Sequence, residues 1–512
     1  MAVFEVLKPG PVLSPRLGSL SLPGKSAIPT PHYIANTSRG VVPHLSQDNL
    51  EKHTNINGLY LGLEDFIEKA PQETPPVFST PCEKAQDSPL RRFIAVRDEQ
   101  LLVLGPRRVP ALDSPGSNTN AGIQIHTSVG HRALSSEYYA SAAIKLCPDV
   151  VVGLGDVMPG HPNPSLKRVE KMGDRTARWM KDLVGAVSHA SRNGGERNGS
   201  NTNGDGHADA NTNGIDAPSS SSHSPAIFAP ILPIEPEQQS YYLSDLTSSP
   251  LFPQLSGLAL YSPSSIASIP AKLSHLPRLS LSNPPTPAKL LHEIAQGVDL
   301  FTLPLADAAT DAGMALLFSF PAPAHPPTPP HKLPLALDAW SPAHATALTP
   351  PSPCCPAPRC YTCRTHSLAY LAHLLSAKEM LAWVLLSIHN HHVLAHFFAG
   401  VRRVLAAPDG AAVFEEERRR FERVYEAELP VRTGTGPRVR GYMVRSRGPG
   451  EARRNERGFA GLALGEGQGE GEGEGSQAVE QPDENDDVTT PGEAGAGEAR
   501  QLVDRGFAVV ET

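Results

Sequence analysis

Four of the six cysteines in this 512-residue chain lie within ten residues of one another: Cys354, Cys355, Cys360 and Cys363. A Cys-x-x-Cys turn such as Cys360 to Cys363 presents two thiolates to one metal ion. A structural zinc ion takes four protein ligands in a tetrahedral arrangement. Either upstream cysteine can supply the third ligand, so the fourth has to come from a distant residue, which constrains how the following segment folds.

His389 is the candidate fourth ligand. A single straight helix from Ser367 to His389 would hold the imidazole roughly 33 Å from the cysteines at 1.5 Å of rise per residue. Residues 376–379, Ser-Ala-Lys-Glu, match a capping box and predict a new helix start. We therefore expect two antiparallel helices, over residues 366–375 and 377–398, which return His389 to the cysteines.

The predicted zinc ligands are Cys355, Cys360, Cys363 and His389, with Cys354 as the alternative to Cys355. In a second interpretation, Cys354 and Cys355 are loop thiols and the histidine-rich end of the segment only caps a helix. Four other histidines are interpreted as helix-surface residues: His373, His391, His392 and His396.

Three segments here resemble the zinc subdomain of the tRNA-guanine transglycosylases: residues 360–375, residues 378–383 and the Ile-His-Asn sequence at 388–390. The resemblance implies one Zn²⁺ per subunit, bound by a Cys-x-Cys-x-x-Cys group and a distant histidine. That pattern places its first cysteine at Pro358, which cannot ligate a metal. Cys355 or Cys354 would therefore replace it through a longer turn.

The rest of the chain alternates short apolar runs with helical segments, which is typical of parallel βαβ units. Such a pattern suits a (β/α)8 barrel or a doubly wound sheet, and the resemblance favours a TIM-like barrel with an N-terminal β-rich segment and a zinc-binding helical appendage. Strands are expected at residues 4–7, 20–22, 32–35, 59–63, 92–96, 101–104, 123–126, 149–154, 226–231, 255–261, 278–282 and 298–301. Helices are expected at about residues 135–146, 171–179, 286–296 and 414–428.

The 52 prolines and 43 glycines are unevenly spread, which indicates long connections between structured parts. Segments rich in Asn, Gly and Ser, or in Gly and Glu, have too few apolar side chains to form a core and are expected to be disordered. We divide the chain into six segments. The first three are a β-rich segment with the first half of the barrel (1–187), a disordered insertion (188–225) and the second half of the barrel with a proline-rich connection (226–353). The last three are the zinc subdomain (354–405), a helix with a basic flank (406–445) and a disordered acidic tail (446–512).

A formal net charge of −8 and a pI near 6.2 exclude a wholly basic nucleic-acid surface, so any such surface must be local. Local basic candidates are Arg107–Arg108, Lys167–Arg168, Arg402–Arg403 and the arginines between 432 and 447. The chain lacks the roughly 18 uninterrupted apolar residues of a transmembrane segment. Clustered cysteines and the absence of a secretory signal indicate a reducing, cytoplasmic location.

The resemblance implies a chemistry that exchanges a guanine in tRNA for a modified base, with one aspartate as nucleophile and a second for proton transfer. The nucleophile follows a Gly-Val-Asp-Leu-Phe sequence, which stands here at 297–301, so Thr302 occupies its position. Asp299 is not expected to replace it, because side chains alternate faces along a strand. The segment that bears the second aspartate has no counterpart at 79–103, and the Gly-Gly-Leu substrate loop is reduced to residues 256–259.

Asp156 matches the family's base-recognising aspartate in position, or is simply a polar residue at a strand end. No catalytic residue is assigned. The resemblance therefore implies a non-catalytic subunit that forms a heterodimer with a catalytic tRNA-guanine transglycosylase subunit and helps to hold tRNA. Two alternatives remain: an independently active transglycosylase that uses another carboxylate, and a zinc-stabilised interaction module without a role in tRNA modification.

Overall fold

The computed structural model describes residues 2–8, 10–11, 13–68, 70, 73–82, 87–113, 117–161, 164–196, 224–248, 250–324, 331–352 and 355–431. Two expectations, the basic flank beyond 431 and the acidic tail, fall outside these residues. The insertion expected at 188–225 is wrong in its first part, because residues 188–196 continue the helix Leu166–Glu196 (α4), and its residues 197–223 lie outside the described part of the chain.

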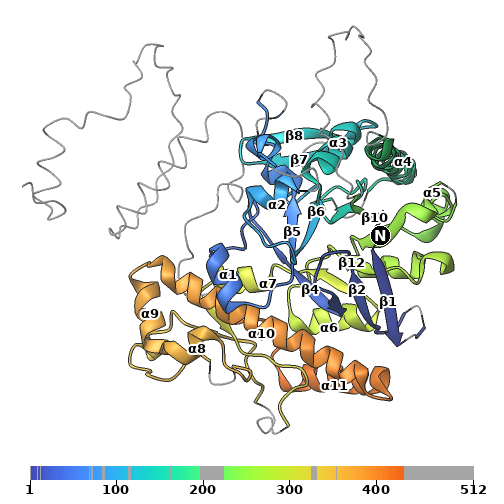
Figure 1. Cartoon of the computed structure of the whole chain (residues 1–512). Coiled ribbons are helices and arrows are strands. Elements are labelled where there is room, and N and C mark those ends of the chain that lie inside the picture. The colour runs from blue at the N-terminus through green and yellow to red at the C-terminus, as the bar shows by residue number, and fades with distance from the viewer. Residues whose placement is uncertain are drawn as a thin grey trace, which may run out of the picture. The chain divides into compact units, whose positions relative to one another are not determined.

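Eight parallel strands close into a barrel (Figure 1), which confirms the predicted fold class. Because both faces of such strands are covered, their sequences are short, continuous apolar runs such as Val150-Val-Val. The strands are β4 (His32–Asn36), β5 (Gly58–Gly62), β6 (Leu101–Gly105), β9 (Val150–Val152), β10 (Ala226–Ile231), β11 (Leu255–Leu260), β12 (Arg278–Ser280) and β13 (Leu300–Thr302). β13 pairs with β4, and β9 pairs with β10, so the first and second halves of the barrel meet at two seams.

An antiparallel sheet of β1 (Val3–Lys8), β2 (Leu17–Ser21) and β3 (Ile28–Thr30) precedes the barrel. Its side chains Leu20 and Ile28 belong to the same hydrophobic cluster as the barrel interior. Ile28 lies beside Gly58, the first residue of β5. The N-terminal sheet therefore closes the amino-terminal end of the barrel and leaves the carboxyl ends of the strands as its mouth.

The remaining elements surround the barrel or extend from it. Two antiparallel ribbons lie outside the barrel, formed by β7 (Gly122–Thr127) with β8 (Gly130–Ser135) and by β14 (Met314–Leu316) with β15 (Ala336–Asp338). The helices are α1 (Gln47–His53), α2 (Pro89–Phe93), α3 (Ser136–Leu146), α4 (Leu166–Glu196), α5 (Ser240–Leu246), α6 (Pro287–Ala295), α7 (Leu305–Asp311), α8 (Tyr361–Thr365), α9 (Leu368–Ser376), α10 (Met380–Ala406) and α11 (Gly410–Val424).

The expected strand at residues 92–96 is wrong, because these residues form the end of α2 and the turn after it. Ser88 caps this helix by accepting a hydrogen bond from the Arg91 backbone, and Pro89 occupies the first turn. The buried Arg91 guanidinium donates to Asp149 at 2.6 Å. The helix cap and this buried ion pair outweigh the β propensity of residues 92–96, which pair with no strand.

A buried ionic cluster joins the N-terminal sheet to the start of β13. The Asp299 carboxylate accepts hydrogen bonds from the Arg16 guanidinium and, at 2.8 Å, from the Arg278 backbone. Asp299 is fully buried, and Arg16 is nearly so. Asp299 precedes β13 whereas Thr302 ends it, so the two residues lie at opposite ends of the strand. Asp299 therefore has a structural role at the closed, amino-terminal end of the barrel.

Replacing Asp299 with alanine should lower the free energy of unfolding by about 3–5 kcal/mol, because it leaves the Arg16 charge buried without a partner. Guanidinium-induced unfolding measures this change. Asp48→Ala, which removes the exposed Asp48–Lys52 pair, is the matched control and should leave the unfolding midpoint nearly unchanged. A loss below about 1 kcal/mol for Asp299→Ala would contradict the role given to this cluster.

Candidate metal centre and barrel mouth

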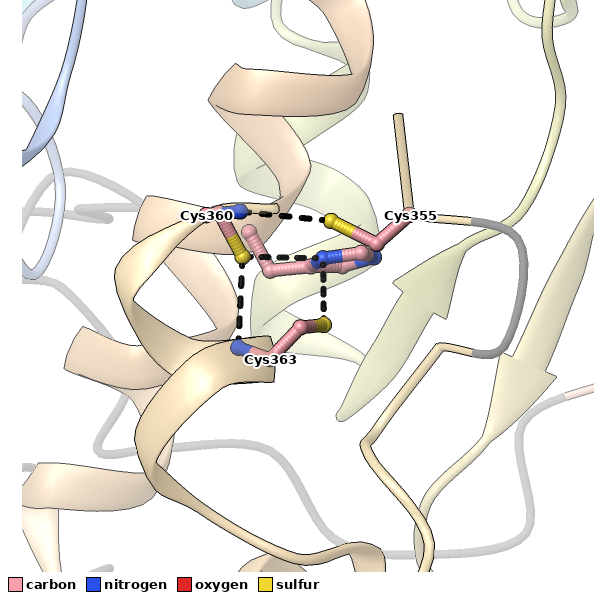
Figure 2. A group of neighbouring side chains, drawn as sticks. Cys355, Cys360 and Cys363 are labelled. Atoms are coloured by element: carbon pink, nitrogen blue, oxygen red, sulfur yellow. Dashed lines mark hydrogen bonds between the residues drawn. The ribbon is translucent and has the colours of Figure 1, made fainter. Parts of the chain in front are cut away.

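Three cysteines and one histidine converge between α8, α10 and the loop before α8. The ligand atoms of Cys355, Cys360, Cys363 and His389 all lie within 4.8 Å of one another, and all four residues are buried. Figure 2 shows the three cysteine side chains pointing toward one another. Cys354 lies outside the described residues. The four residues therefore form a compact group of nitrogen and sulfur atoms that could hold one metal ion.

The start of α8 sets the positions of the cysteine sulfurs. Cys360 is the N-cap residue of this helix, and its sulfur accepts a hydrogen bond from the Cys363 backbone at 3.4 Å. The Cys360 backbone in turn donates to the Cys355 sulfur at 3.4 Å. Backbone N–H groups at a helix start favour negative charge. The turn therefore stabilises thiolates as well as placing them.

The helical hairpin returns His389 to the cysteines as expected, but a different turn reverses the chain. Ser376 ends α9, and its hydroxyl donates to the Ala372 carbonyl instead of capping α10. Lys378 has a φ of 57°, and the backbone N–H groups of residues 378 and 379 donate to the carbonyls of residues 375 and 374. This is a Schellman motif, which ends a helix through one left-handed residue. The predicted capping box is therefore wrong, because the end of α9, and not the start of α10, fixes this turn.

His389 is held from both sides of its ring. Its Nδ1 lies 3.5 Å from the sulfurs of Cys360 and Cys363, and its Nε2 lies 2.9 Å from the Leu316 carbonyl oxygen of β14. A proton on Nε2 is donated to this carbonyl, which leaves Nδ1 facing the sulfurs, where a metal ion could replace the Nδ1 proton. The orientation of the imidazole is thus fixed by its neighbours independently of any ion.

Asn390, the residue after His389, anchors α10 to the same ribbon. Its side-chain oxygen accepts from the Leu316 backbone at 2.9 Å, and its side-chain nitrogen donates to Thr310 and to the Met314 carbonyl. These three hydrogen bonds satisfy a fully buried amide. The Ile-His-Asn sequence therefore combines a candidate ligand with the residue that positions it, a role that the sequence interpretation missed.

The cluster distributes charge unevenly among its thiols. Hydrogen bonds from the other two cysteines lower the pKa of Cys355, whereas contact with Cys355 and Cys360 raises the pKa of Cys363. Burial lowers the pKa of His389, but hydrogen bonds and charge from Cys355 and Cys360 outweigh it and raise the pKa to about 9. The cluster therefore favours negative charge at Cys355, which a bound cation would neutralise. This donor set suits a divalent metal with tetrahedral preference.

The four histidines that were predicted to lie on helix surfaces do not all lie there. His391 is buried, with Nδ1 3.3 Å from the Tyr33 hydroxyl and Nε2 3.7 Å from an Asp307 oxygen. The prediction was wrong for His391 because α10 packs against both the barrel and α7. His373 is exposed, and His392 and His396 are half-buried. Among the described residues, none of these four histidines belongs to the cluster of Cys355, Cys360, Cys363 and His389.

At the barrel mouth, Thr302 is fully buried and its hydroxyl donates to the Ser280 carbonyl at 2.9 Å. A threonine hydroxyl with this hydrogen bond is not a carboxylate and is not activated by a base. Residues 256–259 lie within β11. The carboxyl end of β13 therefore offers no nucleophile.

Asp156 is fully buried and enclosed by basic and amide groups. Its oxygens form ion pairs with Arg168 and, at 3.2 Å, with Arg175, and one accepts from the Asn118 amide at 2.7 Å. Both arginines come from α4, where a spacing of seven residues places them on one face. Asp156 is therefore occupied by the protein's own arginines and has no free oxygen edge for a base.

Two further carboxylates follow β5 and were not predicted. Glu64 accepts backbone hydrogen bonds from Arg108 at 2.9 Å and His126 at 3.0 Å, while Asp65 accepts from the Arg108 guanidinium at 2.7 Å. Burial raises the pKa of Glu64 to about 7, against the opposing effect of Arg108. These carboxylates organise the mouth loops and are already engaged.

The paired basic residues singled out in the sequence are mostly used internally. Arg107 is buried and donates to the carbonyls of residues 124 and 157, and Arg402 donates to the Pro31 carbonyl at 2.7 Å. Arg108 and Arg168 form the ion pairs described above. These four guanidinium groups already have internal acceptors, whereas Lys167 and Arg403 are exposed, so a phosphate contact stays a prediction for those two residues.

A closed parallel barrel with a helical appendage that gathers three cysteines and a histidine is the arrangement that the resemblance to the tRNA-guanine transglycosylases implies. The chain belongs to the queuine tRNA-ribosyltransferase family, whose profile matches residues 13–426.

Curated relatives agree with this membership. The chain is 31% identical to "Queuine tRNA-ribosyltransferase accessory subunit 2" of Schizosaccharomyces pombe over 444 residues, which cover 87% of this chain and 88% of that protein. It is 26% identical to the protein of the same name from Drosophila mojavensis, over 79% of this chain and 90% of the relative. A "Queuine tRNA-ribosyltransferase" from Thermosynechococcus vestitus is 47% identical over 81 residues, 16% of this chain and 20% of that protein. Within the described residues, no helix has both the length and the apolar character needed to cross a membrane.

Proposed function

We propose that this chain is the non-catalytic subunit of a heterodimeric queuine tRNA-ribosyltransferase, supporting the exchange of guanine for queuine at the anticodon wobble position of tRNA. The single observation that carries the proposal is the near full-length similarity to accessory subunit 2 of Schizosaccharomyces pombe. Its partner is a catalytic homologue, and its nucleic-acid ligand is tRNA. We place the complex in the cytoplasm, where the thiols of Cys355, Cys360 and Cys363 would stay reduced.

The absence of chemistry in this subunit is supported by the barrel mouth. The position of the expected nucleophile carries Thr302, Asp299 is sequestered by Arg16 at the other strand end, and Asp156 is neutralised by two arginines. We therefore assign no catalytic residue. The chemical steps fall to the partner, and this chain contributes structure and contact surface.

We further propose that Cys355, Cys360, Cys363 and His389 hold one Zn²⁺. Three sulfurs and an imidazole nitrogen match the preferred donors of this ion, and four protein donors leave no position open for water or substrate. A bound Zn²⁺ would supply a structural link and no catalytic Lewis acid. The ligands come from α10 and from the loop and start of α8, so the ion would fasten the hairpin to the segment before it.

Replacing Cys363 with serine should reduce bound zinc from about one ion per chain to a small fraction of that, because three ligands do not close a tetrahedral site. The substitution should also lower the midpoint temperature of thermal unfolding, because the hairpin loses its link to the segment before it. Elemental analysis of the purified chain measures the metal. Cys82→Ser, which changes an exposed thiol outside the cluster, is the control and should keep the ion. Unchanged zinc in Cys363→Ser would refute this ligand set.

Base exchange on tRNA should be absent with this chain alone, weak or absent with the catalytic partner alone, and strong with both. Incorporation of radiolabelled guanine into tRNA measures the three cases. Turnover by the chain alone would favour an independently active transglycosylase and overturn the proposal. If adding the chain does not change the rate of base exchange by the partner, the proposal also fails. The remaining alternative is then a zinc-stabilised interaction module.

Thr302→Asp should not give this chain turnover of its own, because the segment at 79–103 lacks the motif that bears the second aspartate and Arg168 and Arg175 still occupy Asp156. The same labelling assay measures this variant without partner. Thr302→Val is the control for the lost hydroxyl hydrogen bond. Turnover gained from the single aspartate substitution would contradict our account of the mouth.

A further inference from the structure

Three histidines lie on one face of α10 and lead away from the metal centre. His389, His392 and His396 follow one another at intervals of three and four residues, which places their side chains one above another along the helix. At 1.5 Å of rise per residue, the third lies about 10 Å along the helix axis from the first. His389 is fully buried, whereas His392 and His396 are half-buried. The three side chains therefore run from the cluster towards solvent.

The rings of His392 and His396, here called the histidine pair, lie side by side. Their centroids are 4.3 Å apart, with 46° between the ring planes. Two imidazoles at positions i and i+4 on one face of a helix are an arrangement that binds a divalent metal ion. The histidine pair therefore offers two nitrogen ligands that are close enough to share one ion.

The His392 ring is oriented as a metal-binding imidazole is. Its Nε2 lies 3.2 Å from the Pro356 carbonyl oxygen. A proton on Nε2 is donated to this carbonyl, which leaves Nδ1 as the nitrogen that can bind an ion. The Leu316 carbonyl holds His389 in the same way. Both histidines therefore have a backbone carbonyl that fixes which ring nitrogen is available to a metal.

Cys355 connects the histidine pair to the cluster. It is 8% exposed, whereas the other three residues of the cluster are at most 4% exposed, so the cluster is least covered at this thiol. A hydrogen bond with His392 is among the interactions that lower the pKa of Cys355. His396 interacts electrostatically with Cys355 and with His392. An ion at the histidine pair would therefore lie beside the most accessible cysteine of the cluster.

The charges around the histidine pair permit a cation. Cys355 favours negative charge, and it lies on the cluster side of the pair. Arg403, an exposed residue of the same helix, opposes a cation through its interaction with His396. Solvent screens an exposed charge more strongly than a buried one. The attraction of the thiolate therefore exceeds the repulsion by Arg403.

We propose that His392 and His396 form a second, weaker site for a divalent metal ion, and that Zn²⁺ reaches the cysteine–histidine cluster through it. This inference rests on the proposed zinc site. The ion would first be held by two imidazole nitrogens and water. It would then exchange these ligands for Cys355 and the rest of the cluster, while the protons of the thiols that bind it pass to solvent water. The charge of the ion does not change, because Zn²⁺ has no redox chemistry.

Equilibrium dialysis of the zinc-loaded, untagged full chain against Ni²⁺ tests the second site, because Ni²⁺ suits imidazole ligands. The wild-type chain should bind one Ni²⁺ in addition to its Zn²⁺, as measured by elemental analysis. His396→Ala should weaken Ni²⁺ binding at least ~10-fold, since even the loss of an outer-shell partner costs that much. His392→Gln, which keeps an N–H donor for the Pro356 carbonyl, should have the same effect. His373→Ala removes an exposed histidine of α9 and is the matched control, which should change nothing.

Exchange of the bound ion with radioactive Zn²⁺ tests the route. His396→Ala and His392→Gln should slow this exchange about 10-fold, because the histidine pair no longer raises the local concentration of the ion. Both variants should keep one Zn²⁺ per chain, which a loss of folding would not allow. His396→Asp supplies a carboxylate ligand in place of the imidazole and should restore part of the exchange rate.

Three results would overturn the inference. The first is a zinc-loaded wild-type chain that binds no Ni²⁺. The second is Ni²⁺ binding and zinc exchange that neither His392→Gln nor His396→Ala changes. The third is loss of the tightly bound Zn²⁺ from both variants, which would make the pair part of the cluster. If Cys363→Ser releases the zinc but the wild-type chain binds no Ni²⁺, only this inference fails. If Cys363→Ser keeps its zinc, the proposed zinc site fails instead.

Discussion

The imidazole of His389 is the point on which the distinctive part of this structure depends. One ring nitrogen faces the sulfurs of Cys360 and Cys363, and the other is fixed by the Leu316 carbonyl of β14. The hairpin of α9 and α10, the ribbon of β14 and β15, and the cysteine turn therefore meet at one side chain. Asn390 reinforces the same junction with three buried hydrogen bonds. A metal ion at this position would join elements that the hydrogen bonds already align.

At the barrel mouth, unlike at the cysteine–histidine cluster, the charged groups are already paired with other protein groups. In an active barrel, carboxylates at the mouth stay available for substrate, but here Asp156, Glu64 and Asp65 are each engaged by arginine side chains or by backbone N–H groups. Breaking such buried pairs would leave charges without partners, which costs several kcal/mol. These three carboxylates therefore hold mouth loops together. The contrast between a gathered cluster of three cysteines and a histidine and an engaged mouth adds support to an accessory role.

Much of the architecture could be predicted because its signals are local. Apolar runs such as that of β9 predict buried strands, and the Cys-x-x-Cys spacing predicts a shared ligand position. What could not be predicted depends on distant partners. The two arginines on Asp156 come from α4, and the burial of His391 depends on α7 and β4 packing against α10. The Schellman turn at Lys378 was missed because a lysine in left-handed backbone carries no sequence signal, whereas the competing capping-box letters do.

The central claim is that this chain assists a reaction whose covalent step occurs on another chain. Trapping the protein–tRNA intermediate in the reconstituted heterodimer, followed by denaturing electrophoresis and identification of the chain attached to tRNA, tests it most directly. The account predicts that labelled tRNA migrates with the catalytic partner alone. A covalent adduct on this chain would contradict it.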